Sequence, residues 1–322
     1  MLAFGAILVT KHKKEMIDLV FSSIETIVKF LTSSSSTNSL KETTCWVLLR
    51  IAKFYGEIFE SNSTVFDTLI TNIFQVLPNC RRRQACLLIS TIHYFAKNLR
   101  NEQNCEQNCF SKFTEGALNI LIEFAYKKDA FDAKDNIAAE AFNAIGAIIQ
   151  NATSSCQSVV SGFFATLQNA FQATFNLENF KSEKIRDAYQ AYIAHCFFSG
   201  LTSQLIQMDF ASAKLLTDMI IESFKQRSGI YEEGLLAISS LALIIGKDFE
   251  PIFKDSFGQY LIFALKSTSD VSLCKNAIIT VTEVIRALED NFAAYADQII
   301  PIVFEIITVS RFFFIFKNVF YY

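Results

Sequence analysis

Glycine and proline are scarce in this sequence. It contains 10 Gly and 3 Pro among 322 residues, although these two residue types shape most hairpin turns and sheet bends. Their scarcity nearly excludes a β-sandwich and indicates long helices joined by short polar loops. Because a chain of this length exceeds one ordinary hydrophobic core, we expect either several domains or a repeat array.

Neither sign of charge dominates, and no long apolar run is present. The net charge is −3 and the pI is about 5.7, so the chain has no global basic field that would concentrate nucleic acid or anionic lipid. Even the most apolar stretch, Phe304 to Tyr322, contains Arg311 and Lys317, whereas a membrane span needs about 20 mainly apolar residues. We therefore expect no nucleic-acid partner and no membrane insertion.

Motifs for catalysis and metal binding are also missing. The sequence has no glycine-rich phosphate loop and no HExxH motif, so it predicts no enzyme and no cofactor. Its eight cysteines lack the paired spacing of zinc sites, since Cys105 and Cys109 are far from Cys80 and Cys86. We predict free thiols, no metal and a reducing intracellular compartment.

Apolar residues are abundant and follow a helical period. They make up 51% of the chain and include 33 Phe, which predicts a large buried surface. Helix-period segments alternate with short polar breaks, so the helices group into pairs. The second helix of each pair is expected to start near Leu40, Cys80, Asp135, Lys181, Ile230 and Asp270. These intervals of roughly 40 to 55 residues are typical of HEAT or armadillo repeats.

The fold class predicted from this pattern is all-α. We expect a HEAT-repeat α-solenoid, a right-handed superhelical array of antiparallel helix pairs, with about six to seven repeats over residues 1–308. Residues 309–322 form an unassigned aromatic tail. Because neither end has the polar cap that a solenoid needs, we expect a fragment of a longer array or a truncated gene model, with a tail that need not be native.

Two glycines and one proline help to place helix ends. Pro251 suits the start of a first helix expected to run from Lys247 to Lys266. Gly246 and Gly56 each follow a predicted helix, at the position where a left-handed residue commonly ends it.

Several segments, in order along the chain, resemble the importin-β family of karyopherin nuclear import receptors. Ala3 to Leu8 (AFGAIL), Glu232 to Leu241 (EEGLLAISSL) and Leu273 to Glu305 are similar to successive helices of its central and C-terminal repeats. The resemblance covers about residues 1–308 and implies a receptor in the cytoplasm, in the nucleus and at nuclear pores. The alternative is a HEAT scaffold of another assembly, such as a phosphatase regulatory subunit or another karyopherin.

The same resemblance implies a basic-peptide site on the second helices. Trp46 matches a family tryptophan that stacks on the basic helix of importin-α, and an indole face is the best aromatic partner for a cation; Leu87 replaces the family's next tryptophan. Acids on second helices are expected to steer importin-α or a basic cargo peptide, and they are Glu42, Asp135, Glu140, Glu232, Glu233 and Glu283. The alternatives are that Trp46 only packs between helices and that the acids are solvated.

Two further partners follow from the resemblance. The family binds Phe-Gly nucleoporins between first helices, for which Ile221, Phe224, Phe253 and Phe257 are the candidates here. Ran GTPase is expected to bind the full-length receptor, mainly through N-terminal repeats that this chain does not contain. The run Arg81–Arg83 is either a solvated turn or a contact with an acidic partner.

Overall fold

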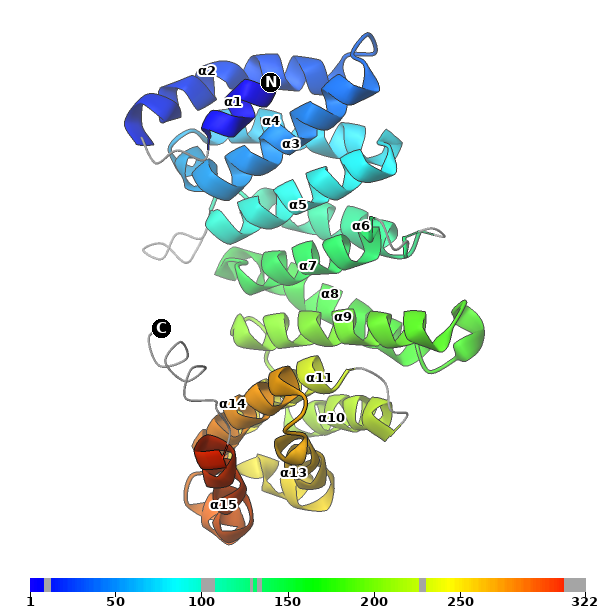
Figure 1. Ribbon diagram of the computed structural model, residues 1–322, viewed down its shortest axis with the longest axis vertical. Helices are drawn as coiled ribbons and strands as arrows, with labels where there is room; N and C mark the ends of the chain where they lie inside the picture. Colours follow the sequence, from blue (N-terminus) through cyan, green and yellow to red (C-terminus); the bar gives the residue numbers. More distant parts are fainter. Residues whose placement is uncertain (9–12, 100–107, 128–129, 132–134, 226–229, 310–322) are drawn as a thin grey trace. The chain divides into compact units, whose positions relative to one another are not determined.

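The computed structural model describes residues 1–8, 13–99, 108–127, 130–131, 135–225 and 230–309. Within these ranges the chain is built of helices, with no strand, and no helix is long and apolar enough to cross a membrane. The chain divides into two compact units, Met1–Ala165 and Thr166–Tyr322, which are coloured blue to green and green to red in Figure 1. The predicted tail lies outside the described residues from 310 onward.

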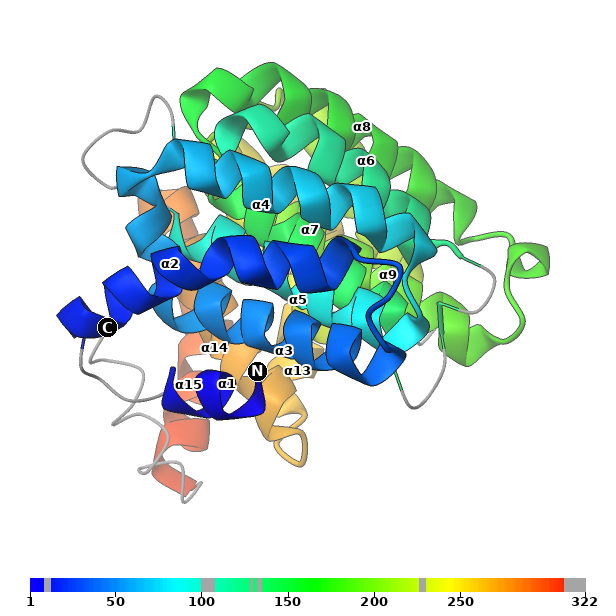
Figure 2. The ribbon, with the colours of Figure 1, turned by 90° about the horizontal axis from the view of Figure 1, so that it is seen from above.

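The first unit is a stack of helix pairs. Along the chain, first helices α2, α4 and α6 alternate with second helices α3, α5 and α7, and each second helix packs against the next (Figures 1 and 2). The bounds are α1 (Leu2–Ile7), α2 (Lys13–Thr32), α3 (Asn38–Tyr55), η1 (Gly56–Ser61), α4 (Ser63–Val76), η2 (Leu77–Asn79), α5 (Arg82–Asn98), η3 (Ser111–Phe113), α6 (Thr114–Ala125), α7 (Ile137–Gln150) and η4 (Ser154–Cys156).

The second unit repeats this pattern. Helix α8 (Gln157–Ala173) runs across the division between the units, and the second helices α9, α11 and α14 then pack in succession. The remaining bounds are η5 (Leu177–Asn179), α9 (Glu183–Thr202), α10 (Phe210–Lys225), α11 (Tyr231–Ile245), η6 (Gly246–Phe249), α12 (Glu250–Ile252), η7 (Phe253–Phe257), α13 (Gly258–Lys266), α14 (Val271–Leu288), η8 (Glu289–Phe292) and α15 (Ala293–Val309).

The second helices start within two residues of the predicted positions. Short polar side chains fix several of these starts: Asn136, Ser182 and Asp270 accept hydrogen bonds from the backbone N–H three residues on. Such a cap satisfies a donor that the first helical turn leaves without a partner. The all-α class with stacked HEAT-type helix pairs is therefore confirmed within each unit, whereas the repeat number over residues 1–308 stays a prediction.

Phenylalanine rings fill the core of the first unit. Phe59, Phe66 and Phe95 are fully buried, and their ring centroids lie 5.2–5.9 Å apart in tilted and edge-to-face arrangements. Burying each ring stabilises the fold by about 1.5–3 kcal/mol, and edge-to-face contacts add to this. Because the rings come from η1, α4 and α5, they tie two consecutive pairs together.

The first helix predicted from Lys247 to Lys266 is interrupted in the structure. Its middle, η7, is a π-helical turn, with α12 before it and α13 after it. A π turn holds one more residue than an α turn, and here it leaves both Phe253 and Phe257 in the core. Gly258 follows, where a Cβ would lie 2.9 Å from the carbonyl oxygen of Phe253.

The two glycines predicted to end helices differ. Gly246 has the positive φ expected of it, +60°, but its ψ of −135° lies outside the left-handed helical region, so the predicted αL conformation was wrong. Gly56 ends α3, but with φ −55° it continues into η1, so its predicted conformation was wrong. The physical reason for glycine there is a close approach, because a Cβ would lie 3.0 Å from Cβ of Asn98.

Candidate functional site

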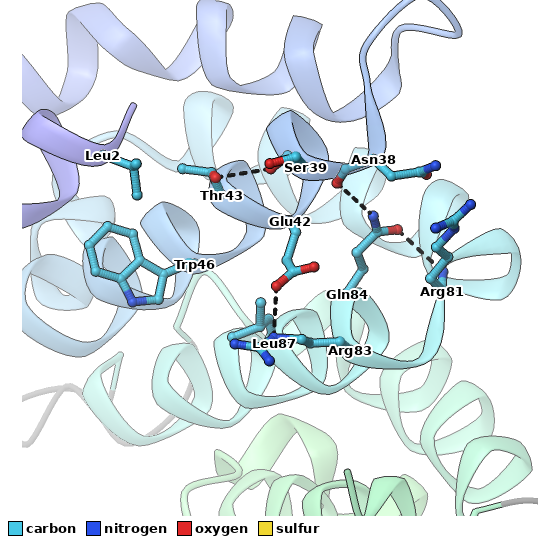
Figure 3. A pocket seen from close by; sticks show the side chains of 10 residues that line it. All are labelled: Leu2, Asn38, Ser39, Glu42, Thr43, Trp46, Arg81, Arg83, Gln84 and Leu87. Carbon is cyan, nitrogen blue, oxygen red and sulfur yellow. Dashed lines mark hydrogen bonds and ion pairs between the residues drawn. The ribbon is translucent and has the colours of Figure 1, made fainter. Parts of the chain in front are cut away.

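A groove of about 510 Å³ lies in the first unit, where α1, α3 and α5 meet (Figure 3). Apolar side chains line one part of it and polar side chains from the start of α5 line the other. Its lining residues are Leu2, Asn38, Ser39, Glu42, Thr43, Trp46, Arg81, Arg83, Gln84 and Leu87. The groove thus contains Trp46, Glu42 and Leu87, three positions that the sequence associated with a basic-peptide site.

Trp46 is half-buried and already holds a cation from its own helix. The guanidinium carbon of Arg50, one turn along α3, lies 4.3 Å from the centroid of the indole. Arg50 Nη1 also donates a hydrogen bond of 3.2 Å to the carbonyl oxygen of Gly5. Gly5 touches the indole so closely that a Cβ there would overlap it. Trp46 therefore packs against α1 and also lines the groove, while its binding of a basic helix stays a prediction.

The three arginines at the start of α5 have different surroundings. Arg82 is half-buried and donates to the carbonyl oxygens of Asp135 (2.8 Å) and Ala130 (3.2 Å), so it ties α5 to the segment before α7. Arg83 is exposed and pairs with Glu42, with 2.7 Å between Nε and Oε1. Arg81 is exposed, lines the groove and makes no ion pair with any described residue.

Gln84 links the two helix starts that border the groove. Its side chain is buried, donates to the carbonyl oxygen of Asn38 at 3.2 Å and accepts from the backbone N–H of Arg81 at 3.2 Å. Because these bonds join the first turns of α3 and α5, they fix the spacing between the two helix starts. Figure 3 shows Gln84 between Asn38 and Arg81.

Of the two predicted acids at α7, Glu140 is engaged through its carboxylate and Asp135, just before the helix, through its backbone. Glu140 Oε2 accepts a hydrogen bond of 2.6 Å from the Ser90 hydroxyl. The backbone carbonyl of Asp135 accepts a hydrogen bond from Arg82. Burial raises the pKa of the Cys86 thiol to about 11, and the Asp135 carboxylate is the second cause of this shift.

Burial also lowers the pKa of His93 on α5. Its Nδ1 lies 3.1 Å from the carbonyl oxygen of Asn143, a contact that a neutral ring donating at Nδ1 fits.

The predicted acids of the second unit differ among themselves. Glu232 on α11 accepts hydrogen bonds from Ser272 and, at 3.4 Å, from Asn276, both on α14. Glu283 pairs with Arg286 at 2.7 Å. For Glu233, burial raises the pKa, and the neighbouring Glu232 raises it further. Glu233 is thus a half-buried carboxylate whose surroundings favour its neutral form.

The four nucleoporin candidates lie in the core. Ile221, Phe224, Phe253 and Phe257 are each at most 4% exposed. Phe224 stacks on Tyr231, with centroids 4.7 Å apart, and Tyr231 in turn contacts Phe263 at 5.6 Å. Phe263 on α13 is 55% exposed. These contacting rings thus connect the buried Phe224, through Tyr231, to Phe263, a surface ring outside the predicted set.

Sequence reasoning missed Arg50, the contact of Gly5 with Trp46, and Phe263. Arg50 had a readable signal, since it follows Trp46 by four residues, the spacing at which helical side chains meet. The seven cysteines that the structure describes form no disulfide, and Cys105 lies outside the described residues.

A family model described as "Importin subunit beta-1-like, TPR repeats" matches residues 68–313. The chain belongs to this family. This importin-β-like chain is 24% identical to importin subunit beta-1 of Arabidopsis thaliana over 311 residues, which are 92% of the chain and 35% of the relative. The chain thus spans about a third of the length of that curated relative.

Solved structures of importin-β proteins share the fold of this importin-β-like chain. A crystal structure of importin beta matches with a TM-score of 0.82 at 20% identity, over 94% of this chain and 35% of the other. The yeast protein Kap95 in complex with Nup1 matches with a TM-score of 0.78 at 20% identity, over 95% and 35%. A further structure, of Kap95p with RanGDP, matches with a TM-score of 0.72 at 21% identity, over 95% and 35%.

Proposed function

We propose that this chain is a segment of a karyopherin-type transport receptor, which binds other proteins along its helices and performs no catalysis. Membership of the importin-β-like family supports this proposal, as do the two neighbouring structures that hold Kap95 with Nup1 and with RanGDP. The partners proposed for the receptor are importin-α or a basic cargo peptide, Phe-Gly nucleoporins and Ran, the last mainly through parts beyond this chain.

The observation that carries the basic-peptide function is the state of Glu233. Burial raises its pKa, and the negative charge of Glu232 raises that pKa further. A Lys or Arg side chain from a peptide would relieve both effects, because an opposite charge within about 4–6 Å favours the ionised carboxylate. Glu232 on α11 supplies further negative charge, whereas Glu283 on the packed helix α14 is paired with Arg286.

Replacing Glu233 by Gln tests this function, because it should not lower the stability of the free protein but should lower its affinity for a basic peptide. The free protein should be as stable as the parent or more stable, since a desolvated charge is removed. Affinity for a labelled Arg/Lys-rich peptide should fall roughly fivefold or more, the value of a charge pair worth about 1 kcal/mol. Fluorescence anisotropy measures the affinity. The matched control is Glu222→Gln on first helix α10, where an exposed acid pairs with Lys225, and it should leave binding unchanged. Equal affinity of the Glu233→Gln variant and the parent would contradict the proposal.

For Trp46 the proposal has an added requirement. A peptide cation can stack on the indole only if Arg50 leaves the ring, because Arg50 lies over it in the free protein. The prediction that Trp46 holds a basic helix is tested by the emission of this single tryptophan when a basic peptide saturates the chain. Unchanged emission removes Trp46 from the basic-peptide site and leaves the proposal on Glu233 untouched.

We propose that nucleoporins bind at the exposed Phe263, because the four residues predicted from the sequence are buried. Phe263 offers an exposed ring beside Tyr231, and the buried Phe224 supports Tyr231 from below. An incoming Phe ring would extend this aromatic series and bury apolar surface worth about 1.5–3 kcal/mol. Phe263→Ser should therefore weaken binding of a Phe-Gly peptide about tenfold. The control is Leu243→Ser, which removes an apolar side chain of similar exposure (40%) from second helix α11; equal loss in both variants would contradict the assignment.

A further inference from the structure

Arg50 makes two contacts that an arginine of a partner can take over. Its guanidinium carbon lies 4.3 Å from the centroid of the Trp46 indole, and its Nη1 donates a hydrogen bond of 3.2 Å to the carbonyl oxygen of Gly5. Both contacts suit a guanidinium in general, because this planar group stacks on a ring with its face and donates hydrogen bonds from its edge. The indole and the carbonyl oxygen therefore form a subsite, and Arg50 shows which chemistry fits it.

No carboxylate fixes Arg50 in this place. It makes no ion pair with any residue that the structure describes, and Glu42, the only acid of α3, is paired with Arg83. Arg50 is half-buried, so its guanidinium has only a short way to move to reach water. A cation–π contact at such a site is weak compared with a buried ion pair whose partner would be left without a counter-charge. Arg50 can therefore leave the ring at a modest cost in free energy.

The indole is covered in the free protein. Trp46 lies beside Leu2 at one side of the groove (Figure 3). Helix α1 contacts the ring at Gly5, where a Cβ would overlap it, and Arg50 lies over the ring as well. A basic segment that enters the groove thus meets a ring that already holds a positive charge. A cation can stack where Arg50 lies only by exchanging with it.

We propose that Arg50 is a built-in competitor, which occupies a guanidinium-selective subsite made of the Trp46 indole and the Gly5 carbonyl oxygen until an arginine of a basic partner displaces it. The inference rests on the proposed basic-peptide function and adds the regulation and the selectivity of one of its sites. The apparent affinity at the ring is the intrinsic affinity multiplied by the fraction of molecules that Arg50 has left. Arginine is favoured over lysine in the partner, because an ammonium is strongly hydrated and has no planar face to stack on the indole.

Removal of Arg50 should tighten binding, an effect that a merely structural arginine would not give. The emission of the single tryptophan is followed while an Arg-rich peptide is added to the 322-residue chain. Arg50→Ala should lower the midpoint of this titration roughly fivefold, the size expected when a cation–π contact no longer competes. The matched control is Lys53→Ala, which removes the same charge from the same helix. The ammonium of Lys53 lies over the rings of Tyr94 (5.3 Å) and Phe54 (5.6 Å) instead, so the control should shift the midpoint by less than about twofold.

A second variant and a second peptide complete the test. Arg50→Gln removes the charge but keeps a donor for the Gly5 oxygen, so it should also tighten binding and covers the case in which circular dichroism shows that Arg50→Ala disturbs the fold. A peptide of equal length with Lys in place of Arg should bind the parent chain at least about threefold more weakly. Equal midpoints for the two peptides would overturn the selectivity.

The remaining outcomes separate this inference from the function on which it rests. Midpoints for both Arg50 variants that are no lower than that of Lys53→Ala would overturn the proposal, since the partner would then not compete with Arg50. If peptide binding still depends on Glu233 in that case, the inference about Arg50 is wrong and the basic-peptide function stands. If neither the parent nor any Arg50 variant binds a basic peptide, both are wrong.

Discussion

The second helices of the two units differ in their balance of charge. Helices α3, α5 and α7 carry six Lys and Arg against two acids, whereas α9, α11 and α14 carry four against five. The net charge of −3 for the whole chain hides this difference. A near-neutral total therefore excludes a field over the whole molecule but not local fields of opposite sign on successive repeats.

The acids of the two units also differ in their partners. In the first unit Glu42 is paired with Arg83 and Glu140 accepts from Ser90, so the chain itself satisfies the carboxylates that the sequence offered to a basic peptide. In the second unit Glu232 accepts from Ser272 and Asn276 and Glu283 pairs with Arg286, whereas Glu233 is half-buried beside another acid. Glu233 is therefore the predicted acid whose surroundings set the second unit apart from the first.

The largest effects are expected from core rings and would separate the two units. Phe95→Ala and Phe257→Ala each remove a fully buried ring and should cost about 3–5 kcal/mol of stability. Trp46 reports only on the first unit, so Phe95→Ala should shift its denaturant transition while Phe257→Ala leaves that transition in place and lowers the midpoint seen by circular dichroism. If both variants shift the Trp46 transition equally, the units unfold as one cooperative body.

Replacing one glycine in each unit by alanine compares how tightly the helices of the two units pack at these positions. At Gly234 a Cβ would lie 2.6 Å from Phe224 and 2.9 Å from Ile220, both on α10, a helix of 16 residues in the core. Gly234→Ala should therefore cost about 1–3 kcal/mol through overpacking. At Gly5 the Cβ would meet Trp46, but α1 has only six residues and can shift. Gly5→Ala should cost less and change the Trp46 emission; equal thermal destabilisation of both variants would contradict this.

Mild acid should affect the two units in opposite directions. The pKa of Glu233 is raised, so the folded state binds more protons than the unfolded state, and its contribution favours folding increasingly as pH falls from neutral toward 4.5. Burial lowers the pKa of His93, with Lys97 acting in the same direction and the Asn143 carbonyl and Glu140 opposing it. Its contribution to stability is therefore lost as pH falls below 6.5 through the folded pKa. Glu233→Gln and His93→Gln should therefore alter the slope of stability with pH with opposite signs, as measured by urea titrations from pH 7.5 to 4.5. Slopes equal to the parent's in both variants would contradict the assignment.

The smallest effect is expected at exposed ion pairs. Arg83→Gln removes the pair with Glu42, in which both side chains are well exposed (66% and 42%), and should change stability by less than about 1 kcal/mol. Arg286→Gln removes the Glu283 pair of the second unit and should do the same. Thermal melts at low and high salt measure both. A loss above about 2 kcal/mol for Arg83→Gln alone would mean that Glu42 is destabilising unless it is paired.

Helix positions were predictable from the sequence because they depend on local chemistry. Asn136, Ser182 and Asp270 lie just before apolar periodic segments, and their side chains bond to backbone within three residues. The positive φ of Gly246 was predictable for the same reason, although its ψ was not. Gly56 was not, because what requires glycine there is Asn98, more than 40 residues away.

The site was predictable only in part because it depends on which neighbours cover each side chain. Periodicity placed Phe224 and Phe253 on first helices but gave no measure of how completely other helices bury them. Trp46 lines a groove, and the basic helix expected to bind it stays a prediction. The position of Arg50 over the Trp46 ring depends also on Gly5 of α1, whose carbonyl oxygen accepts a hydrogen bond from the guanidinium.

The π turn η7 determines how the chain tolerates changes in length. It accommodates one extra residue between α12 and α13, so deletion of a single residue there would give a continuous α-helix and leave the residues after it on their present faces, with Phe263 at the surface and Leu261 buried. A deletion in the middle of an unbroken helix such as α14 instead rotates every later residue of that helix by about 100° about its axis. The chain should therefore tolerate loss of one residue within 253–257 better than loss of one residue in the middle of α14.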